Sequence, residues 1–276
     1  MKNIIILYHN DLDGFGAAWA AWKKFGNKAD YLAVDFGKSM PVGLKNKEVY
    51  ILDFCYSEAE TRMILKNNKK LIVIDHHITQ KDTIKILKEY IWDIKRAGCV
   101  LSWKYFHPQK KIPKLIEYVE DMDLWKFKLK DTREIIPFLE TLPRDFKIWD
   151  KVISEMENKN KFSEYLEKGK VIAGFMEKII EILASNSEDA IFEGKKASVV
   201  NSPIFNSELG GYLLKKTKNS VVIIWSLKND GVRVSLRSLK GVDVSKLAQK
   251  YGGGGHKQAA GFFLEVGEKI PWQIKK

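Results

Sequence analysis

Residues 3–14 read N-I-I-I-L-Y-H-N-D-L-D-G, an apolar run that ends in a histidine and two aspartates. A short apolar run of this kind predicts a strand buried on both faces, as strands of a parallel sheet are. His9, Asp11 and Asp13 follow at alternate positions, and a chain that continues in extended form carries alternate side chains on one side. The stretch therefore predicts a buried strand that brings three polar side chains towards one point.

The rest of the first half alternates β-rich runs with helical patterns. Apolar residues recur at helical spacing within residues 15–25. Ser57 and Glu60 form an S-x-x-E capping box, so a helix is expected to begin there and to run towards residue 67. This alternation predicts an α/β fold in which helices wrap a parallel sheet. Further strands are expected at 30–34, 49–53 and 70–74.

The second half predicts a helical connector followed by a smaller domain. Residues 151–187 keep one apolar helical face, and residues 185–189 indicate a polar boundary. Beyond it, β-rich runs at 197–201, 221–225, 232–236 and 261–266 accompany helical patterns at 207–216 and 244–251. We therefore expect three parts: a parallel-sheet domain over 1–150, a helical connector over 151–189 and a mixed α/β domain over 190–276.

Composition favours a folded, cytoplasmic protein without a membrane partner. The 276 residues are 45% hydrophobic and 30% charged, which is typical of a chain that buries a core. The N-terminal apolar run is too short for a signal peptide, and Cys55 and Cys99 stand too far apart to suggest a disulfide framework. The net charge of +12 fits a polyanionic partner, but a lysine-rich solvated surface explains it as well.

Three further acidic or histidine clusters follow where the predicted strands and a helix end. They are Asp53, the triplet Asp75-His76-His77, and Asp121 with Asp123. Taken alone, a strand-end aspartate is more often a cap or turn residue, and a histidine pair is more often polar surface. Four such clusters in this order favour a metal site instead, because crowded carboxylates repel one another unless cations neutralise them.

The residue types suggest two divalent cations. Imidazole and carboxylate together suit Mn²⁺, Fe²⁺, Co²⁺ or Zn²⁺, and the excess of oxygen ligands leans towards Mn²⁺ or Mg²⁺. A pair of such ions can activate a water molecule and neutralise a leaving oxygen. Phosphoester hydrolysis is the reaction that this arrangement predicts.

The order H-x-D-x-D-G, strand Asp, D-H-H and a later Asp resembles the DHH phosphoesterase superfamily. The tail G-G-G-G-H-K-Q-A-A-G at 252–261 is similar to the glycine-rich motif of the DHH-associated C-terminal domain. The segment E-D-M-D-L-W at 120–125 looks most like the nanoRNase-like or cyclic-nucleotide-phosphodiesterase-like branch. The two motifs together span residues 9–261, which is nearly the whole chain.

The resemblance implies roles for the matching positions. One metal ion would be held by His9, Asp11 and Asp53, and Asp53 would bridge to a second ion. Asp75 would orient a ligand, and His77 would face the scissile phosphate as a binder or proton donor. Either Asp121 or Asp123 could complete the set, with Asp121 preferred. The expected ligands of the second ion are Asp13, Asp53, His76 and Asp121.

The glycine run at 252–255 is expected to bind substrate. It lacks the G-K-[ST] ending of a P-loop, and glycine lets a phosphate or base approach the backbone closely. The alternative is that the glycines only end a helix and form a turn, for which one glycine would suffice. Arg233 and Arg237 fall on one face of a predicted strand, and Arg237 matches the family position for substrate contact. The expected substrate-binding residues are Arg237, Gly253, Gly254, Gly255 and His256.

The leading hypothesis is hydrolysis of short oligoribonucleotides, or of linear or cyclic dinucleotides, with Mn²⁺ as the expected cofactor and Mg²⁺ or Co²⁺ as alternatives. The resemblance also allows a 3′-phosphoadenosine 5′-phosphate phosphatase, a single-strand exonuclease of the RecJ kind, a pyrophosphatase or an inactive nucleotide sensor. No additional nucleic-acid-binding domain is expected after Lys276, which disfavours the RecJ kind. A homodimer is expected by analogy only.

Overall fold

A computed structural model describes residues 1–35 and 38–275, and it divides the chain into two compact units, Met1–Ala173 and Gly174–Lys276. The division falls inside one long helix, α8 (Lys159–Ser185). The segment expected as a connector, 151–189, therefore holds the end of α7 (Phe146–Met156), all of α8 and the start of a strand. Apolar residues in the first part of α8 pack in the core of the N-terminal unit, and Ile180 and Ala184 pack in that of the C-terminal unit.

The N-terminal unit is built on a parallel sheet, as expected. Its strand order is β2-β1-β3-β4-β5, and the strands are β1 (Ile4–His9), β2 (Ala29–Val34), β3 (Glu48–Leu52), β4 (Lys70–Asp75) and β5 (Tyr90–Trp92). The four predicted strands are confirmed to within one residue. The three-residue β5 was not predicted, because it is too short to show a pattern.

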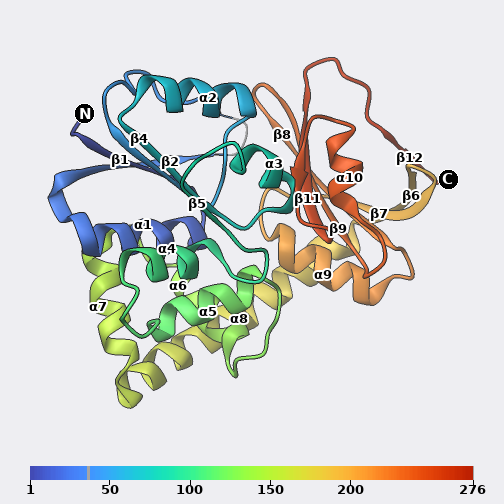
Figure 1. The fold of residues 1–276 in the computed structure, drawn as a ribbon. Coiled ribbons are helices and arrows are strands. Elements are labelled where there is room, and N and C mark those ends of the chain that lie inside the picture. Colours follow the sequence, from blue (N-terminus) through green and yellow to red (C-terminus); the bar gives the residue numbers. More distant parts are fainter. Residues whose placement is uncertain (36–37, 276) are drawn as a thin grey trace. The chain divides into compact units, whose positions relative to one another are not determined.

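Helices cover both faces of this sheet (Figure 1). Side chains alternate along β1, so Ile5 and Leu7 pack on one face, while Ile6 and Tyr8 pack on the other. The helices α2 (Glu58–Asn67) and α3 (Lys81–Ile84) lie over the first face, and α1 (Leu12–Phe25) and α4 (Gly98–Phe106) lie over the second. A strand buried on both sides explains why residues 3–8 are almost wholly apolar.

Two local devices begin the first helices where the sequence suggested. The capping box is present: Ser57 Oγ accepts from Glu60 N, and the Glu60 carboxylate accepts from Ser57 N. At the start of α1, the Asp11 carboxylate accepts from Gly14 N at 2.8 Å. A Cβ atom at Gly14 would lie 2.0 Å from the carbonyl oxygen of His9, so only glycine lets the chain turn from strand into helix here.

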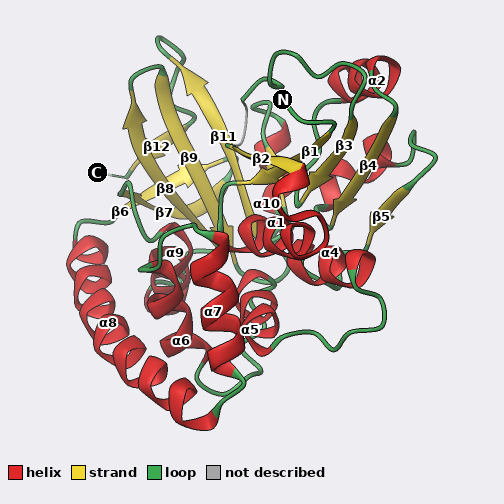
Figure 2. Cartoon of the chain, turned by 90° about the vertical axis from the view of Figure 1, so that its left-hand side faces the viewer, coloured by secondary structure: helices red, strands yellow, loops and turns green. Residues whose placement is uncertain are grey.

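Three further helices extend the second face. They are α5 (Lys114–Asp123), α6 (Thr132–Glu140) and α7, and Figure 2 shows them grouped beside α1 and α4. Aromatic rings fill the space between them: Phe15 stacks on Phe146 and meets Trp149 edge to face. Trp19 is buried and stacks on Trp103. This packing joins α1 to α7 and to α4.

The C-terminal unit carries a mixed sheet, as expected. Its strand order is β10-β11-β9-β8-β7-β6-β12, and only β7 and β8 pair in parallel. The strands are β6 (Glu188–Phe192), β7 (Lys195–Asn201), β8 (Val221–Lys228), β9 (Gly231–Ser238), β10 (Gly254–Gly255), β11 (Ala259–Glu265) and β12 (Trp272–Ile274), with helices α9 (Asn206–Lys216) and α10 (Val244–Gln249). The predicted polar boundary at 185–189 is partly wrong, because pairing with β7 makes Glu188 and Asp189 part of β6.

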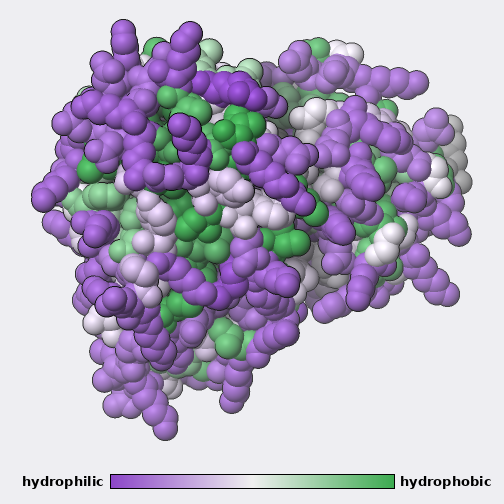
Figure 3. All heavy atoms as spheres, in the orientation of Figure 1, coloured by the Kyte–Doolittle hydropathy of each residue, from purple (hydrophilic) through white to green (hydrophobic). Residues whose placement is uncertain are grey.

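Charged and polar side chains dominate the visible face of the molecule in Figure 3. None of the helices in the described ranges is both long enough and apolar enough to cross a bilayer.

Candidate metal centre and substrate-binding segment

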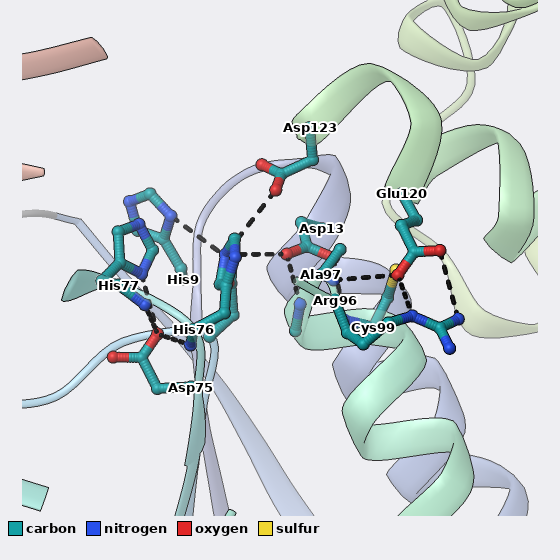
Figure 4. A network of polar contacts seen from close by, with 12 residues as sticks. His9, Asp13, Asp75, His76, His77, Arg96, Ala97, Cys99, Glu120 and Asp123 are labelled. Carbon is teal, nitrogen blue, oxygen red and sulfur yellow. Dashed lines mark hydrogen bonds and ion pairs between the residues drawn. The ribbon is translucent and has the colours of Figure 1, made fainter. Parts of the chain in front are cut away.

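The candidate metal centre lies where the strand order of the parallel sheet reverses. β1 lies between β2 and β3, so the chain continues on one side of β1 with β2 and on the other side with β3. Ligands of open α/β sheets bind at such points. His9 ends β1, Asp53 follows β3 and Asp75 ends β4. The predicted convergence of these residues at one sheet edge is confirmed. Figure 4 shows His9 and Asp75 in the network of polar contacts around the histidine pair.

Asp53 is the centre of this network. Its side chain is buried, with Oδ2 3.7 Å from His9 Nδ1 and Oδ1 3.1 Å from His76 Nε2. The backbone at Asp53 has a φ of +65°, and its N–H donates to Ile74 O at 2.8 Å. Positive φ is uncommon for a residue other than glycine, and it turns the side chain inward at the end of β3. One carboxylate is thus shared by two groups of potential ligands.

The first group is His9, Asp11 and Asp53, whose potential ligand atoms lie within 4.8 Å of one another. His9 Nδ1 is 2.8 Å from Asp11 Oδ2. The second group is Asp13, His76 and Asp123, whose potential ligand atoms also lie within 4.8 Å of one another. These are the two sets that the sequence suggested, apart from one member of the second.

That member is Asp121, and the expectation that it joins the cluster is not met. Its carboxylate is 4% exposed and accepts from Lys128 N at 2.8 Å, Leu129 N at 3.1 Å and Thr132 Oγ1 at 2.6 Å. Asp123 Oδ2 lies 3.6 Å from His76 Nε2 instead. Both aspartates are on α5, and residues two apart on a helix do not share a face, so only one of them can reach the centre.

Asp13 is positioned by the N-terminus of α4, which the sequence did not reveal. Its two carboxylate oxygens accept from Gly98 N at 2.7 Å and Cys99 N at 2.8 Å, and Oδ2 also lies 3.5 Å from His76 Nε2. Backbone N–H groups at a helix start favour an anion. A Cβ atom at Gly98 would lie 2.6 Å from Asp53 Oδ1, so the glycine makes room for the central carboxylate.

Glu120 fixes α4 against α5. Its carboxylate accepts from Arg96 Nε at 2.5 Å, from Arg96 Nη2 at 3.1 Å and from Ala97 N at 3.1 Å. The helix that carries Asp123 is thereby tied to the helix whose amides hold Asp13. Sequence reasoning missed Glu120, Arg96 and Gly98, and their only signal was the E-D-M-D segment and a glycine at the start of an apolar run.

Asp75 supports the histidine pair. Its buried Oδ1 accepts from His76 N at 2.7 Å and His77 N at 3.2 Å, and it lies 2.7 Å from His77 Nδ1. Burial lowers the pKa of His77, but the charge of Asp75 and its hydrogen bond together raise the pKa overall. The expected orienting role thus falls on the ring of His77 and the backbone of His76. Trp92 Nε1 donates to His77 O at 3.0 Å and holds the same loop.

The electrostatics of the cluster fit a cation. Burial, together with the charges of Asp53 and Asp123, raises the pKa of Asp13 well above its usual range, and burial raises the pKa of Asp123 to about 6. Burial also opposes the ionisation of Asp53, but hydrogen bonds from His76 and His9 hold its pKa well below the usual range. Carboxylates that resist ionisation together are relieved by a divalent ion, and mixed imidazole and carboxylate ligands suit a transition metal.

The glycine run of the C-terminal unit is required by the local backbone. Gly252 follows α10 with a φ of +72°, Gly253 has no room for a Cβ beside the Gly261 carbonyl at 2.0 Å, and Gly255 has a φ of +134°. Gly253 N donates to Ala248 O at 3.0 Å. One glycine would therefore not suffice here, contrary to expectation, because the backbone itself needs three of the four. Substrate binding by Gly253, Gly254 and Gly255 stays a prediction.

Arg237 is held on β9 against α9. Its Nη1 donates to Leu236 O and its Nη2 donates to Ser207 Oγ, each at 2.8 Å. A Cβ atom at Gly210 would lie 2.5 Å from Arg237 Cγ, so α9 packs directly on the side chain. Burial lowers the pKa of Arg237 to about 10, against the opposing charge of Glu208. A largely desolvated guanidinium in this setting favours an anionic partner. Ala259 pairs with Arg237 in the sheet, and its carbonyl oxygen accepts from His256 N at 2.7 Å, which closes a tight turn.

Family models match both units. A model of the DHH family, N-terminal domain, matches residues 3–122, and a model of the DHHA1 domain matches residues 197–275.

Individual proteins are similar over most of the chain. It is 32% identical over 285 residues to the uncharacterized protein R106 of Acanthamoeba polyphaga mimivirus, spanning 93% of this chain and 66% of that protein. It is 23% identical over 298 residues to oligoribonuclease NrnB of Bacillus subtilis (strain 168), spanning 92% and 71%. RecJ of Thermus thermophilus, solved in complex with Mn²⁺, has a similar fold, with a TM-score of 0.53, 16% identity, and coverage of 95% of this chain and 49% of RecJ.

Proposed function

Because the chain belongs to the DHH phosphoesterase superfamily, we propose that it is a two-metal phosphodiesterase that cleaves short oligonucleotides or linear or cyclic dinucleotides. The observation that carries this proposal is the buried carboxylate of Asp53, with one oxygen towards His9 and the other towards His76. A single carboxylate between two ligand groups would suit a pair of divalent ions that lie close together. The name of the similar protein NrnB, an oligoribonuclease, supports the substrate class.

The chain's own residues supply the ligands. His9, Asp11 and Asp53 would hold one ion, and Asp13, Asp53, His76 and Asp123 the other. When bound, two such ions lower the pKa of a water molecule and neutralise charge on the leaving oxygen. Mn²⁺ is our proposal for the metal, since the donor set mixes imidazole with carboxylate oxygen.

His77 is proposed to act on the substrate phosphate, and Asp75 is proposed to orient it. With His77 Nδ1 held 2.7 Å from Asp75 Oδ1, the ring keeps a fixed tautomer and orientation. Burial lowers the pKa of His77, but the charge of Asp75 and its hydrogen bond raise it overall, which favours the protonated imidazole. We assign its other ring nitrogen to a phosphate oxygen, as a hydrogen-bond or proton donor.

The C-terminal unit is proposed to hold the rest of the substrate. Arg237 would donate to a phosphate, and Gly253, Gly254, Gly255 and His256 would contact the substrate where the backbone lacks side chains. This assignment is independent of the metal ligands. The homodimer stays a prediction.

A substrate panel in Mn²⁺ tests the proposed function. It contains di- to pentaribonucleotides, cyclic dinucleotides, 3′-phosphoadenosine 5′-phosphate, single-stranded DNA and pyrophosphate. We expect mononucleotides to be released from the short RNA or the dinucleotides. Release of inorganic phosphate from the phosphoadenosine, or shortening of long DNA alone, would replace the proposed function with the phosphatase or RecJ-like alternative.

A further inference from the structure

The loop between α5 and α6, residues 124–131, concentrates aromatic and basic side chains beside the metal centre. It begins directly after Asp123, which belongs to the second ligand group. The loop reads L-W-K-F-K-L-K-D, with Lys126, Lys128 and Lys130 alternating with apolar residues. Neither the metal ligands nor the glycine-rich segment accounts for this composition.

The backbone of this loop is strained at its two aromatic residues. Trp125 has a φ of +53° and Phe127 a φ of +46°. For bulky side chains such values are outliers that persist only where the surrounding structure enforces them, and they gather at functional sites. A loop that only had to connect two helices could place glycine or asparagine at both positions.

Asp121 enforces this conformation. Its carbonyl oxygen accepts from Lys126 N at 2.9 Å, and its carboxylate accepts from Lys128 N and Leu129 N at 2.8 and 3.1 Å. Thr132 Oγ1 donates to the same carboxylate at 2.6 Å. A buried carboxylate with three donors fixes the loop from inside. The aspartate that does not join the metal centre therefore has a role of its own.

The result is an indole that is supported yet exposed. Trp125 is 42% exposed, and the Phe127 ring meets it edge to face at 4.8 Å. The Arg133 guanidinium covers the Phe127 ring at 3.5 Å and keeps that support in place. Single exposed aromatic residues are ordinary on protein surfaces. An indole held by strain and by a second ring, two residues from a metal ligand, is not explained by chance exposure.

We propose that Trp125 stacks on a nucleobase of the substrate and that Asp121 is the residue that positions it. This inference rests on the proposed function and names one of its substrate contacts. Aromatic rings among basic side chains are the chemistry that binds a base and its phosphates together, and such stacking tolerates any base because every base has a π face. Lys126 also donates through Nζ to Lys95 O at 3.2 Å, which ties the loop to the chain ahead of α4.

Binding of adenosine 5′-monophosphate and of ribose 5-phosphate, measured by calorimetry on the full chain with Mn²⁺, tests the proposal without turnover. The two probes differ only in the base. We expect the wild type to prefer the nucleotide, W125A to reduce that preference about five- to a hundredfold, and W125F to keep most of it. F175A removes a ring that is 65% exposed on α8 and serves as the matched control, with an unchanged preference.

The outcomes separate the two ideas. A preference that survives in W125A, a wild type that binds both probes equally, or equal loss of both probes in W125A overturns the stacking role. If the preference depends on Trp125 but the wild type cleaves no member of the substrate panel, the stacking role stands and the phosphodiesterase assignment falls. If the wild type cleaves a member of the panel but the preference does not depend on Trp125, the phosphodiesterase assignment stands and the stacking role falls.

Discussion

The two candidate binding regions bury charge of opposite sign. At the edge of the parallel sheet, Asp13 and Asp123 have raised pKa values because burial and neighbouring carboxylates oppose their ionisation. On β9 of the C-terminal unit, burial lowers the pKa of Arg237 to about 10. The first region is relieved by a cation and the second by an anion. One chain thus carries buried carboxylates that would be relieved by a cation and a guanidinium that would be relieved by an anion.

The two regions also differ in how their geometry is fixed. In the metal centre, side chains are held by other side chains and by the amides of α4, so exact positions depend on packing between α1, α4 and α5. In the glycine-rich segment, the absence of side chains sets the geometry, because Gly253 and Gly255 approach neighbouring backbone too closely for a Cβ atom. We therefore expect the metal centre to be sensitive to loss of a charge and the glycine-rich segment to be sensitive to an added side chain.

The largest effect is expected from D53N. Asparagine keeps the shape but removes the shared charge, so we expect Mn²⁺ binding to fall from two ions per chain and turnover to drop by about 10³-fold or more. Metal counting after gel filtration and the rate on a dinucleotide measure this. Removing the metal with a chelator and restoring it should reproduce the loss and the recovery in the wild type. Full turnover by D53N would show that the metal centre does not need the charge of Asp53.

D123N and D121N form the next test, because they remove the same charge two residues apart on α5. D123N should weaken metal binding and lower turnover about 10²-fold, since Asp123 Oδ2 lies beside His76. D121N should keep two Mn²⁺ ions and instead lower the free energy of unfolding by about 1–3 kcal/mol, because three donors lose a charged acceptor. The reverse pattern in metal counting would restore Asp121 as the ligand.

G98A sharpens the point that packing fixes the metal centre. Its new Cβ would lie 2.6 Å from Asp53 Oδ1, so we expect Mn²⁺ affinity to fall about 10- to 100-fold without loss of any ligand. The matched variant is G174A on α8, where no neighbouring atom outside the helix lies within 4 Å of the new Cβ. This variant should raise the free energy of unfolding by up to about 1 kcal/mol, because alanine favours a helix more than glycine does. Titration with Mn²⁺ and thermal unfolding give the two readouts. Equal Mn²⁺ affinities in the two variants would contradict this view.

The smallest effect is expected from R237K on the anion side. Lysine keeps the charge but lacks the planar set of donors, so KM for a dinucleotide should rise about tenfold while the number of bound Mn²⁺ ions stays at two. R233K changes an exposed arginine on the same strand and is the control, with KM unchanged. A loss of metal in R237K would show that the two regions are not independent in the way proposed.

Local patterns in the sequence predicted the strands of the first sheet and most of the residues that meet at its edge. Period and polarity are local properties: the run before His9 had to be a buried strand, and a parallel sheet brings strand ends such as Asp53 and Asp75 to one edge. The capping box at Ser57 was equally local, because its partners lie three residues apart. In the mixed sheet of the C-terminal unit, β7, β8, β9 and β11 followed from the same patterns, whereas β6, β10 and β12 were not predicted.

Which aspartate of α5 reaches the candidate metal centre depends on tertiary packing and is not shown by the sequence. Asp121 and Asp123 are equivalent in composition, and the rotation of α5 against α4, fixed by Glu120 with Arg96, turns one inward and leaves the other to hold the loop. The need for glycine at position 98 likewise comes from contact with Asp53, which is 45 residues away in the chain. Contacts between distant segments depend on how helices pack on a sheet, and local pattern carries no record of that rotation.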